Sequence, residues 1–251
     1  MNGALYAAVS GSLSAVQRLD ITANNLANTS TAGFKAQHLL VSSKSPWEFT
    51  VPGGTSPWLD VSARTTVATA HQTVTDLSQG VIRESGNPLD VAISGPGFFV
   101  VTTPNGERYT RQGQFHLEPG GTLVTGAGYP VQGDGGEEIR LPAGQIEIDA
   151  NGGIWVDGNR MATLRLVRIT DPQAVIPEGG ALFAARPQAP VVGTDPVETR
   201  LVQGSVEEAN IDVVKGLLDL IDVARGYETY MRAMQQVDAS VQMAIQQVAG
   251  I

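Results

Sequence analysis

The three histidines are the side chains best suited to acid–base or metal chemistry at neutral pH. They are His38, His71 and His116, and they stand far apart, without an HExxH spacing or any other short metal-binding pattern. The chain has no cysteine, which excludes disulfides, Cys-based zinc sites and thiol nucleophiles. A shared catalytic or metal site is therefore possible only if the fold gathers the histidines.

Acidic residues are the next candidates for catalysis, and two pairs of them are sequence neighbours. These are Glu137 with Glu138 and Glu207 with Glu208. Side chains of neighbouring residues diverge on a strand or a helix, so neither pair suits general acid and base catalysis. The sequence also lacks the G-x-S-x-G pattern of a serine nucleophile. We therefore expect no catalytic residues.

Glycine-rich stretches could bind phosphate or metal, but their patterns are incomplete. SGPGFF, TGAGYP and GDGGEE contain neither a Walker lysine nor a full G-x-G-x-x-G, and hairpin turns explain them better. Asp149, Asn151 and Gly153 faintly resemble a calcium loop, yet the distal bidentate glutamate is missing. An Asn-Gly turn at Asn151 and Gly152 is the better interpretation. The sequence thus predicts no metal, no cofactor and no small-molecule substrate.

Composition excludes several classes of partner. The net charge is -9 and the sixteen basic residues are scattered singly, which argues against nucleic acid and against anionic membranes. No apolar run approaches the roughly 18 residues of a membrane span. Hydrophobic residues make up 42% and charged residues 16%, so the surface is weakly charged. Such a surface is typical of a protein that is buried against neighbours.

The elements that carry this surface begin with an N-terminal helix over residues 4–27. Its apolar residues follow one another at alternating steps of four and three, which is a heptad seam. The seam consists of Leu5, Val9, Ser12, Val16, Leu19, Ala23 and Leu26. Only Arg18 and Asp20 are charged before Lys35, so we expect a helix with more than one neighbour. The segment also lacks the basic region of a cleaved signal peptide, and we expect it to be retained.

The C-terminal segment repeats this pattern. Its seam consists of Val213, Leu217, Leu220, Ala224, Tyr227, Met231, Met234, Asp238, Val241, Ile245 and Val248. Asp238 is the one charged member, and it either sets the register of the helices or simply lies in solvent. Gly226 costs about 1 kcal/mol relative to alanine in an isolated helix.

Between the helices, short apolar or alternating runs are bounded by Gly, Pro, Asn and Asp, as in antiparallel strands and tight turns. The fold class predicted is α+β, with an all-β middle domain inserted between terminal helices that pair as a coiled coil. The predicted regions are 1–36 for the first helix and its exit, 37–75 for an extended arm, 76–205 for the β domain and 206–251 for the second helix.

One segment, ANNLANTSTAGFK from Ala23 to Lys35, is denser in Asn, Thr and Gly than a helix end requires. Asn25 and Asn28 can cap the first helix, Gly33 permits a positive φ where the chain turns away, and Phe34 can anchor the exit. Capping explains some of these residues and leaves the rest without a role.

This segment closely resembles the N-terminal signature of the rod and hook proteins of the bacterial flagellum. Residues 76–101, 109–131 and 201–228 resemble further blocks of the same family, in the same order. Ala209 and Ile211 depart mildly from the family pattern. The motif positions are Asn24, Asn25, Leu26, Ala27, Asn28, Thr31, Gly33, Phe34 and Lys35 in the first block, and Gln203, Gly204, Glu207, Asn210, Arg225, Tyr227 and Glu228 in the last.

The resemblance implies an axial structural subunit of the flagellar basal body. Its length and compact middle are most similar to the proximal rod member, with the distal rod member as the alternative and a secreted β-fold adhesin or enzyme as a more remote one. The implied partners are copies of itself, other rod proteins and the flagellar type III export apparatus. The implied location is the rod within the periplasm, reached without a cleaved signal peptide, where the helices build a tube that transmits torque.

Overall fold

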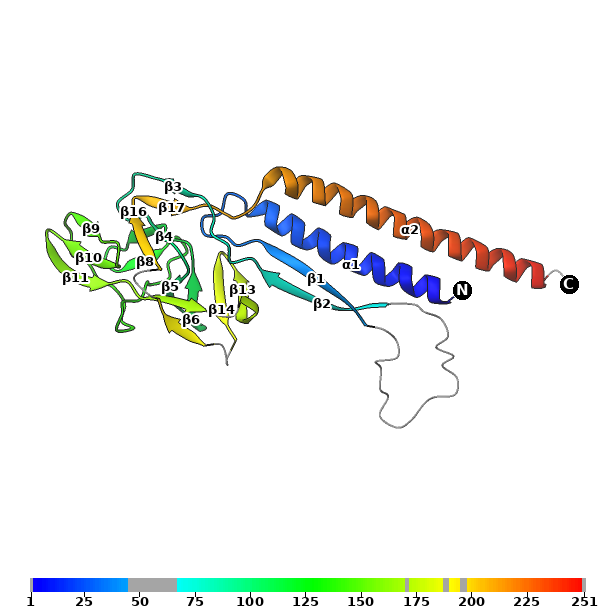
Figure 1. The fold of residues 1–251 in the computed structure, drawn as a ribbon, viewed down its shortest axis with the longest axis horizontal. Coiled ribbons are helices and arrows are strands. Elements are labelled where there is room, and N and C mark those ends of the chain that lie inside the picture. Colours follow the sequence, from blue (N-terminus) through cyan, green and yellow to red (C-terminus); the bar gives the residue numbers. More distant parts are fainter. Residues whose placement is uncertain (1, 45–66, 170–171, 187–189, 195–197, 250–251) are drawn as a thin grey trace, which may run out of the picture. The chain divides into compact units, whose positions relative to one another are not determined.

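The computed structural model describes residues 2–44, 67–169, 172–186, 190–194 and 198–249 (Figure 1). Within these ranges, the side chains of residues 2–7, 41–44, 67–71, 241, 244, 245 and 247–249 are outside the description. The chain divides into two compact units. Unit 1 consists of Met1–Leu26, Gln37–Val74 and Val213–Ile251, and unit 2 consists of Ala27–Ala36 and Thr75–Asp212.

Unit 1 contains both long helices. Helix α1 spans Asn2–Ala27 and helix α2 spans Val213–Ala249. The mostly β region of unit 2 is therefore an insertion between two helical ends, which confirms the predicted α+β class. Pairing of the helices as a coiled coil remains a prediction.

Helix α2 begins later than the predicted boundary at residue 206. Residues Ser205–Glu207 instead form strand β17, which pairs antiparallel with β3, Ile82–Glu84. The heptad pattern starts at Val213, and the helix starts at the same residue. The predicted domain boundary at residue 206 was set earlier than this pattern. Backbone pairing with β3 is available to residues 205–207, and this explains why they are extended.

The arm predicted over 37–75 is paired where it is described. Strand β1, Gln37–Lys44, and strand β2, Val67–Thr75, form a two-stranded sheet in unit 1 (Figure 1). This pairing was not predicted, because the alternation in these two runs is weak. The rest of the arm, residues 45–66, lies outside the described residues.

Among its described residues, unit 2 contains strands β3 to β17 and one short 3-10 helix, Pro172–Ala174. Every strand pair whose register is described there is antiparallel, as the short runs and tight turns predicted. Besides β3 and β17, the strands are β4 (Val91–Ser94), β5 (Phe98–Thr103), β6 (Gly106–Thr110), β7 (Phe115–Leu117), β8 (Leu123–Thr125), β9 (Ile146–Ile148), β10 (Gly153–Val156), β11 (Asn159–Thr163), β12 (Leu166–Ile169), β13 (Val175–Gly179), β14 (Leu182–Ala185), β15 (Val191–Gly193) and β16 (Arg200–Gln203).

The largest sheet has the order β13-β14-β6-β5-β12-β15, and a three-stranded sheet has the order β11-β10-β9. The last two strands of the unit, β16 and β17, pair with the first two, β4 and β3. These two pairs bring the beginning and the end of the β region side by side.

Strand β5 explains why the core has two parts. Its side chains alternate between two buried clusters, with Phe99 and Val101 in one and Phe98 and Val100 in the other. Phe99 packs edge-on against Phe115 at a centroid distance of 5.0 Å, and Phe98 packs against Phe183 at 5.7 Å. A strand buried on both faces reads as a continuous apolar run, which is what FFVV is in the sequence.

Candidate functional site

The family-like segment after α1 packs tightly against other parts of unit 2. Gly33 has a φ of +69°, and its amide donates to the backbone oxygen of Glu207 at 2.7 Å. A Cβ on Gly33 would collide with the backbone of Arg111. The predicted positive φ is therefore confirmed, and the close approach gives a second reason for glycine. Phe34, expected to anchor the exit, is buried beside it.

Lys35 and Glu207 form a fully buried ion pair. Their charged atoms, Nζ and Oε1, are 2.6 Å apart, and both side chains have no exposed area. The same carboxylate accepts a hydrogen bond from the Gly80 amide at 2.9 Å. Its other oxygen, Oε2, lies 3.1 Å from Nη1 of Arg111, whose side chain is also buried. We call Lys35, Arg111 and Glu207 the ionic cluster.

The ionic cluster contains two cations and one anion, and backbone oxygens accept further hydrogen bonds from the two cations. Lys35 Nζ also donates to the Ser78 oxygen at 2.6 Å, and Arg111 Nη2 donates to the Gly95 oxygen at 2.9 Å. The Arg111 guanidinium lies over the Phe98 ring at 5.3 Å, while its Nε has no partner among the described residues. Burial lowers the pKa of Lys35 below its usual value near 10.5, although Glu207 opposes this shift.

Asn210 fastens the same region just before α2. Its Oδ1 accepts from the Ala36 amide at 2.8 Å, and its Nδ2 donates to the Asp76 oxygen at 3.0 Å and to Ser78. One side chain thus joins the end of the N-terminal segment, the start of the β region and its C-terminal end. The motif Asn is therefore a tether between backbones, which explains why an amide that both donates and accepts stands here.

Gln203 and Gly204 have a comparable role at the other side of the β region. Gln203 Nε2 donates to the backbone oxygens of Pro88 and Ile146, and its Oε1 accepts from the Ile148 amide at 3.2 Å. Gly204 has a φ of +72° at the junction of β16 and β17. This junction allows the two strands to pair with different partners.

The asparagines at the end of α1 make hydrogen bonds to the chain beyond the helix, and their predicted capping role remains a prediction. Asn25, in unit 1, exchanges two hydrogen bonds with the backbone of Gln37, at 2.8 and 3.0 Å, and so fixes the start of β1. Asn28, in unit 2, accepts from Thr31 through its side chain and its backbone oxygen. Asn24 is exposed. The dense Asn cluster therefore orders the chain after the helix.

The predicted seam of α1 has exposed, half-buried and buried members, and Ser12 is the buried one. Val9, Val16 and Ala23 are exposed, whereas Leu19 and Leu26 are half-buried; the Leu5 side chain is outside the description. Ala8, Ser12 and Ala15 are the buried side chains among those described on the helix. Ser12 belongs to the predicted seam, whereas Ala8 and Ala15 each precede an exposed seam residue, Val9 and Val16.

Helix α2 is still more exposed. Among its described side chains only Val223 is buried. Of the predicted seam, Val213, Leu217, Met231 and Asp238 are exposed and Leu220, Ala224, Tyr227 and Met234 are half-buried, while the side chains of Val241, Ile245 and Val248 are outside the description. These residues remain predicted assembly contacts, since a single chain does not test them.

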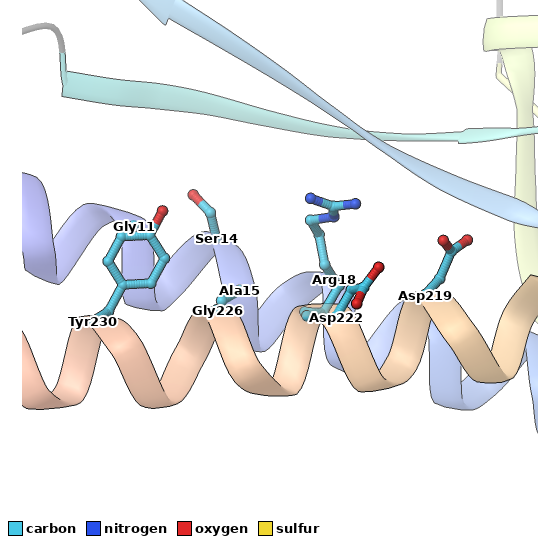
Figure 2. A pocket seen from close by; sticks show the side chains of 9 residues that line it. Gly11, Ser14, Ala15, Arg18, Asp219, Asp222, Gly226 and Tyr230 are labelled. Carbon is cyan, nitrogen blue, oxygen red and sulfur yellow. The ribbon is translucent and has the colours of Figure 1, made fainter.

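The two helices contact each other through small residues. A Cβ on Gly11 would lie 2.5 Å from the Tyr230 ring, and one on Gly216 would lie 4.0 Å from Leu26. Between these contacts the helices border a groove of about 300 Å³, lined by Ser14 and Arg18 from α1 and by Asp219, Asp222, Gly226 and Tyr230 from α2 (Figure 2). The labelled polar side chains all rise on one side of the helix pair.

The candidate catalytic and metal residues do not form a site among the residues described. His38 and His71 lie on β1 and β2 of unit 1, and His116 lies on β7 of unit 2. Of the adjacent glutamates, the Glu207 side chain is fully buried and the Glu208 side chain is 45% exposed, so the two diverge as predicted. No group of three His, Asp or Glu side chains in the described part of the chain is placed to hold a metal ion.

Asp149 illustrates how a calcium-like pattern serves a turn. Its Oδ1 accepts from the amides of Asn151 and Gly153, at 2.8 and 2.9 Å, and its Oδ2 accepts from the Trp155 indole at 3.2 Å. Gly152 has a φ of +92° in the predicted turn. Burial raises the pKa of Asp149, but the hydrogen bonds from Gly153, Trp155 and Asn151 outweigh it and leave that pKa below 3.8.

The ionic cluster was not predicted from the sequence. Lys35 and Glu207 were both assigned to the family pattern, but as separate positions 172 residues apart. Arg111 lies in the block 109–131, and nothing in the sequence distinguished it as a buried charge. The available hint was Lys35, which is the one charged residue of the segment from Ala23 to Lys35 and so invites a search for a buried partner.

In the described part of the chain, no helix is both long enough and apolar enough to cross a membrane. Three family models match the chain: "Flagella basal body rod protein" over residues 5–35, "Flagellar hook protein FlgE/F/G D1 domain" over 92–156 and "Flagellar basal body rod FlgEFG protein C-terminal" over 202–247. These matches cover both ends and much of the middle, in agreement with the blocks recognised in the sequence.

Several curated proteins are similar along the whole chain. The flagellar basal-body rod protein FlgF of Caulobacter vibrioides is 33% identical over 100% of both chains, and FlgF of Rhizobium meliloti is 31% identical over 100% of this chain and 99% of its own. FlgF of Escherichia coli K12 is 34% identical over 95% of both chains. The flagellar basal-body rod protein FlgG of Bacillus subtilis is 27% identical over 95% of this chain and 96% of its own. The chain therefore belongs to the flagellar basal-body rod protein family and is a structural subunit of the bacterial flagellar rod.

Proposed function

We propose that the chain is a subunit of the proximal rod and that it assembles through its two terminal helices. Full-length similarity to FlgF proteins, at 31–34% identity, supports the proximal assignment. FlgG proteins are also similar, at 27% identity for Bacillus subtilis and 31% for Agrobacterium fabrum. A distal-rod role is therefore the second candidate.

The observation that carries the assembly proposal is the exposure of large apolar side chains on both helices. On α1 these are Val9, Leu13 and Val16, and on α2 they are Val213, Val214, Leu217, Leu218 and Ile221. Isolated helices are marginally stable in water and derive most of their stability from packing. Helix α2 has 37 residues, or roughly 55 Å, and little of it is covered within the chain. Neighbouring subunits would supply the missing cover.

The proposal includes export and force transmission. The chain would pass through the flagellar type III apparatus, and its helices would become fully packed only at the growing end of the rod in the periplasm. The ionic cluster and the tethers made by Asn210 and Gln203 then hold the segments of unit 2 in fixed positions. A stiff subunit of this kind transmits torque by packing alone, with no cofactor.

A charged substitution on an exposed seam position tests the proposal. Leu217→Asp should abolish incorporation into the rod and motility, because a carboxylate would be buried in a helix interface. It should leave the unfolding of unit 2 unchanged. Met161→Asp is a matched control, since Met161 on β11 and Leu217 have nearly equal exposed fractions, 47% and 45%. Full motility of the Leu217→Asp strain would contradict assembly through α2.

Complementation separates the two rod positions. The gene should restore motility to a Caulobacter vibrioides strain that lacks FlgF and should fail in a strain that lacks FlgG. The reverse result would assign the chain to the distal rod.

A further inference from the structure

Helix α2 carries a second heptad seam, one position away from the predicted one. It consists of Val214, Leu218, Ile221, Arg225, Glu228 and Arg232, spaced at alternating steps of four and three, and every member is exposed. The first three positions are apolar and the last three are charged. Among the ion pairs of the described residues, none includes Arg225, and Glu228 meets only Arg232, at 3.3 Å. We call this row the outer seam.

The groove between α1 and α2 holds three charged side chains that form no ion pair with any other described residue. Arg18 projects into it from α1, and Asp219 and Asp222 project into it from α2 (Figure 2). With one cation and two carboxylates, the groove has a formal charge of -1.

Gly226 adds a steric observation in the same groove. Apart from the adjacent turns of its own helix, a Cβ at this position would meet no atom of the described chain within 4 Å, so the packing of this chain does not require a glycine there. Glycine nevertheless weakens a helix by about 1 kcal/mol relative to alanine. The empty space at Gly226 leaves room for side chains that come from outside the chain.

We propose that the outer seam of one copy of this chain seats in the groove of a neighbouring copy, with Arg225 between Asp219 and Asp222 and Glu228 facing Arg18. The charges are complementary, because Arg225 meets two carboxylates and Glu228 meets a guanidinium. The lengths also agree, since Ile221–Arg232 and the α2 side of the groove from Asp219 to Tyr230 each span about 16 Å.

The geometry of the contact suits a growing array. The outer seam and the groove are different surfaces of the same subunit, so the contact is heterologous and can continue from copy to copy. Forming it requires Glu228 to leave Arg232, which costs little because that pair is exposed on the helix surface. This inference rests on the proposed assembly through the helices and specifies which surfaces meet.

Charge reversal tests it in living cells. Asp222→Arg changes the groove from -1 to +1, and Arg225→Asp places a carboxylate opposite Asp219 and Asp222. Since like charges at an interface cost several kcal/mol, each variant alone should reduce the amount of subunit in isolated rods by about tenfold or more. Asp134→Arg, at an exposed position on unit 2, changes the net charge by the same amount as Asp222→Arg and is the control, which should assemble normally.

Co-expression of the two single variants distinguishes contact between copies from an effect within one helix. In a mixed rod, the unmodified outer seam of the Asp222→Arg chain meets the unmodified groove of the Arg225→Asp chain. In the reverse contact, the carboxylate introduced at position 225 meets the guanidinium introduced at position 222. Incorporation should therefore return to within about twofold of the unmodified chain, as complementary charges are restored. If each variant failed because of its own helix, or because the partner is another rod protein, the mixture would not recover and the inference would be overturned.

Cross-linking gives an independent measurement, because the chain has no cysteine. Two differently tagged chains, one with Asp222→Cys and one with Arg225→Cys, should yield a mixed-tag dimer with a short bis-maleimide reagent in assembled rods. The pair Asp134→Cys and Arg225→Cys should not. Normal incorporation of the cysteine variants without the mixed dimer would refute the inference while leaving the rod function intact. If Leu217→Asp prevented incorporation while Asp222→Arg and Arg225→Asp were both incorporated normally, the inference would also be refuted and the rod function would stand.

Discussion

Removing the charge of Glu207 is the most direct test of what holds unit 2 together. Glu207→Gln keeps the shape of the side chain but deletes the only anion of the ionic cluster. Lys35 and Arg111 would then remain buried with no carboxylate between them. Glutamine also replaces one of the two accepting oxygens with an NH2 group, whose N–H donors would face either the Lys35 ammonium or the Arg111 guanidinium.

The magnitude follows from the burial of the three side chains. Breaking a fully buried ion pair by removing one partner costs about 3–5 kcal/mol, because the other charge stays desolvated. For a domain of 150–250 residues each kcal/mol shifts Tm by roughly 2–4 °C. Glu207→Gln should therefore lower the Tm of unit 2 by about 6–20 °C.

The next residue supplies a matched control. Glu208 pairs with Arg83 at 2.7 Å, but the two side chains are 45% and 65% exposed, so Glu208→Gln should cost no more than about 1 kcal/mol. Unfolding can be followed by Trp155 fluorescence in a background with Trp47 and Trp58 changed to Phe. Equal Tm values for Glu207→Gln and Glu208→Gln would show that the ionic cluster does not stabilise the fold.

Three further substitutions test the rest of the site. Gly33→Ala should cost more than about 2 kcal/mol of stability in urea unfolding, because a positive φ alone costs about 1–2 kcal/mol and the added Cβ would also collide with the backbone of Arg111. Gly128→Ala is the control. Gly128 has a φ of +82° and no atom within 4 Å of an added Cβ, so this substitution should show the backbone cost alone. Gln203→Ala should cost about 1–3 kcal/mol in the same assay, as backbone groups lose their partners; an unchanged midpoint would argue against its role as a tether. The lowered pKa of Asp149 stabilises the fold above the usual value of 3.8 and loses that effect as pH falls through the folded pKa. Asp149→Asn should therefore flatten the dependence of stability on pH in this acidic window, and the Trp155 indole proton should titrate there by NMR in the unmodified chain; a pH-independent indole resonance would contradict the hydrogen bond.

Local signals predicted the elements of this protein well. The heptad spacing located both helices, and α1 agrees with the predicted range to within two residues at its start. The continuous run of Phe98, Phe99, Val100 and Val101 became a strand buried on both faces. The positive φ of Gly33 and the turn at Gly152 were also predicted, because each depends on a few consecutive residues.

The same signals do not say which side chains of the helices are buried within one chain. Of the predicted α1 seam, Ser12 is buried together with Ala8 and Ala15, whereas Val9 and Val16 are exposed. A nearly uncharged helix has several faces that could be buried, and the sequence pattern does not distinguish packing within one chain from packing between chains. The start of α2 was placed too early for a related reason, since pairing of β17 with β3 depends on residues far away in the sequence.

The sequence by itself determined the α+β class, the two helical ends, the absence of a thiol or a histidine motif and, through four ordered blocks, the flagellar rod family. Only the tertiary structure decided what the charged residues of those blocks do. Lys35 and Glu207 are 172 residues apart, and their 2.6 Å contact exists because the last two β strands return to pair with the first two. Heptad spacing repeats within a single helix, whereas a buried ion pair depends on the path of the whole chain, so no local pattern contains it.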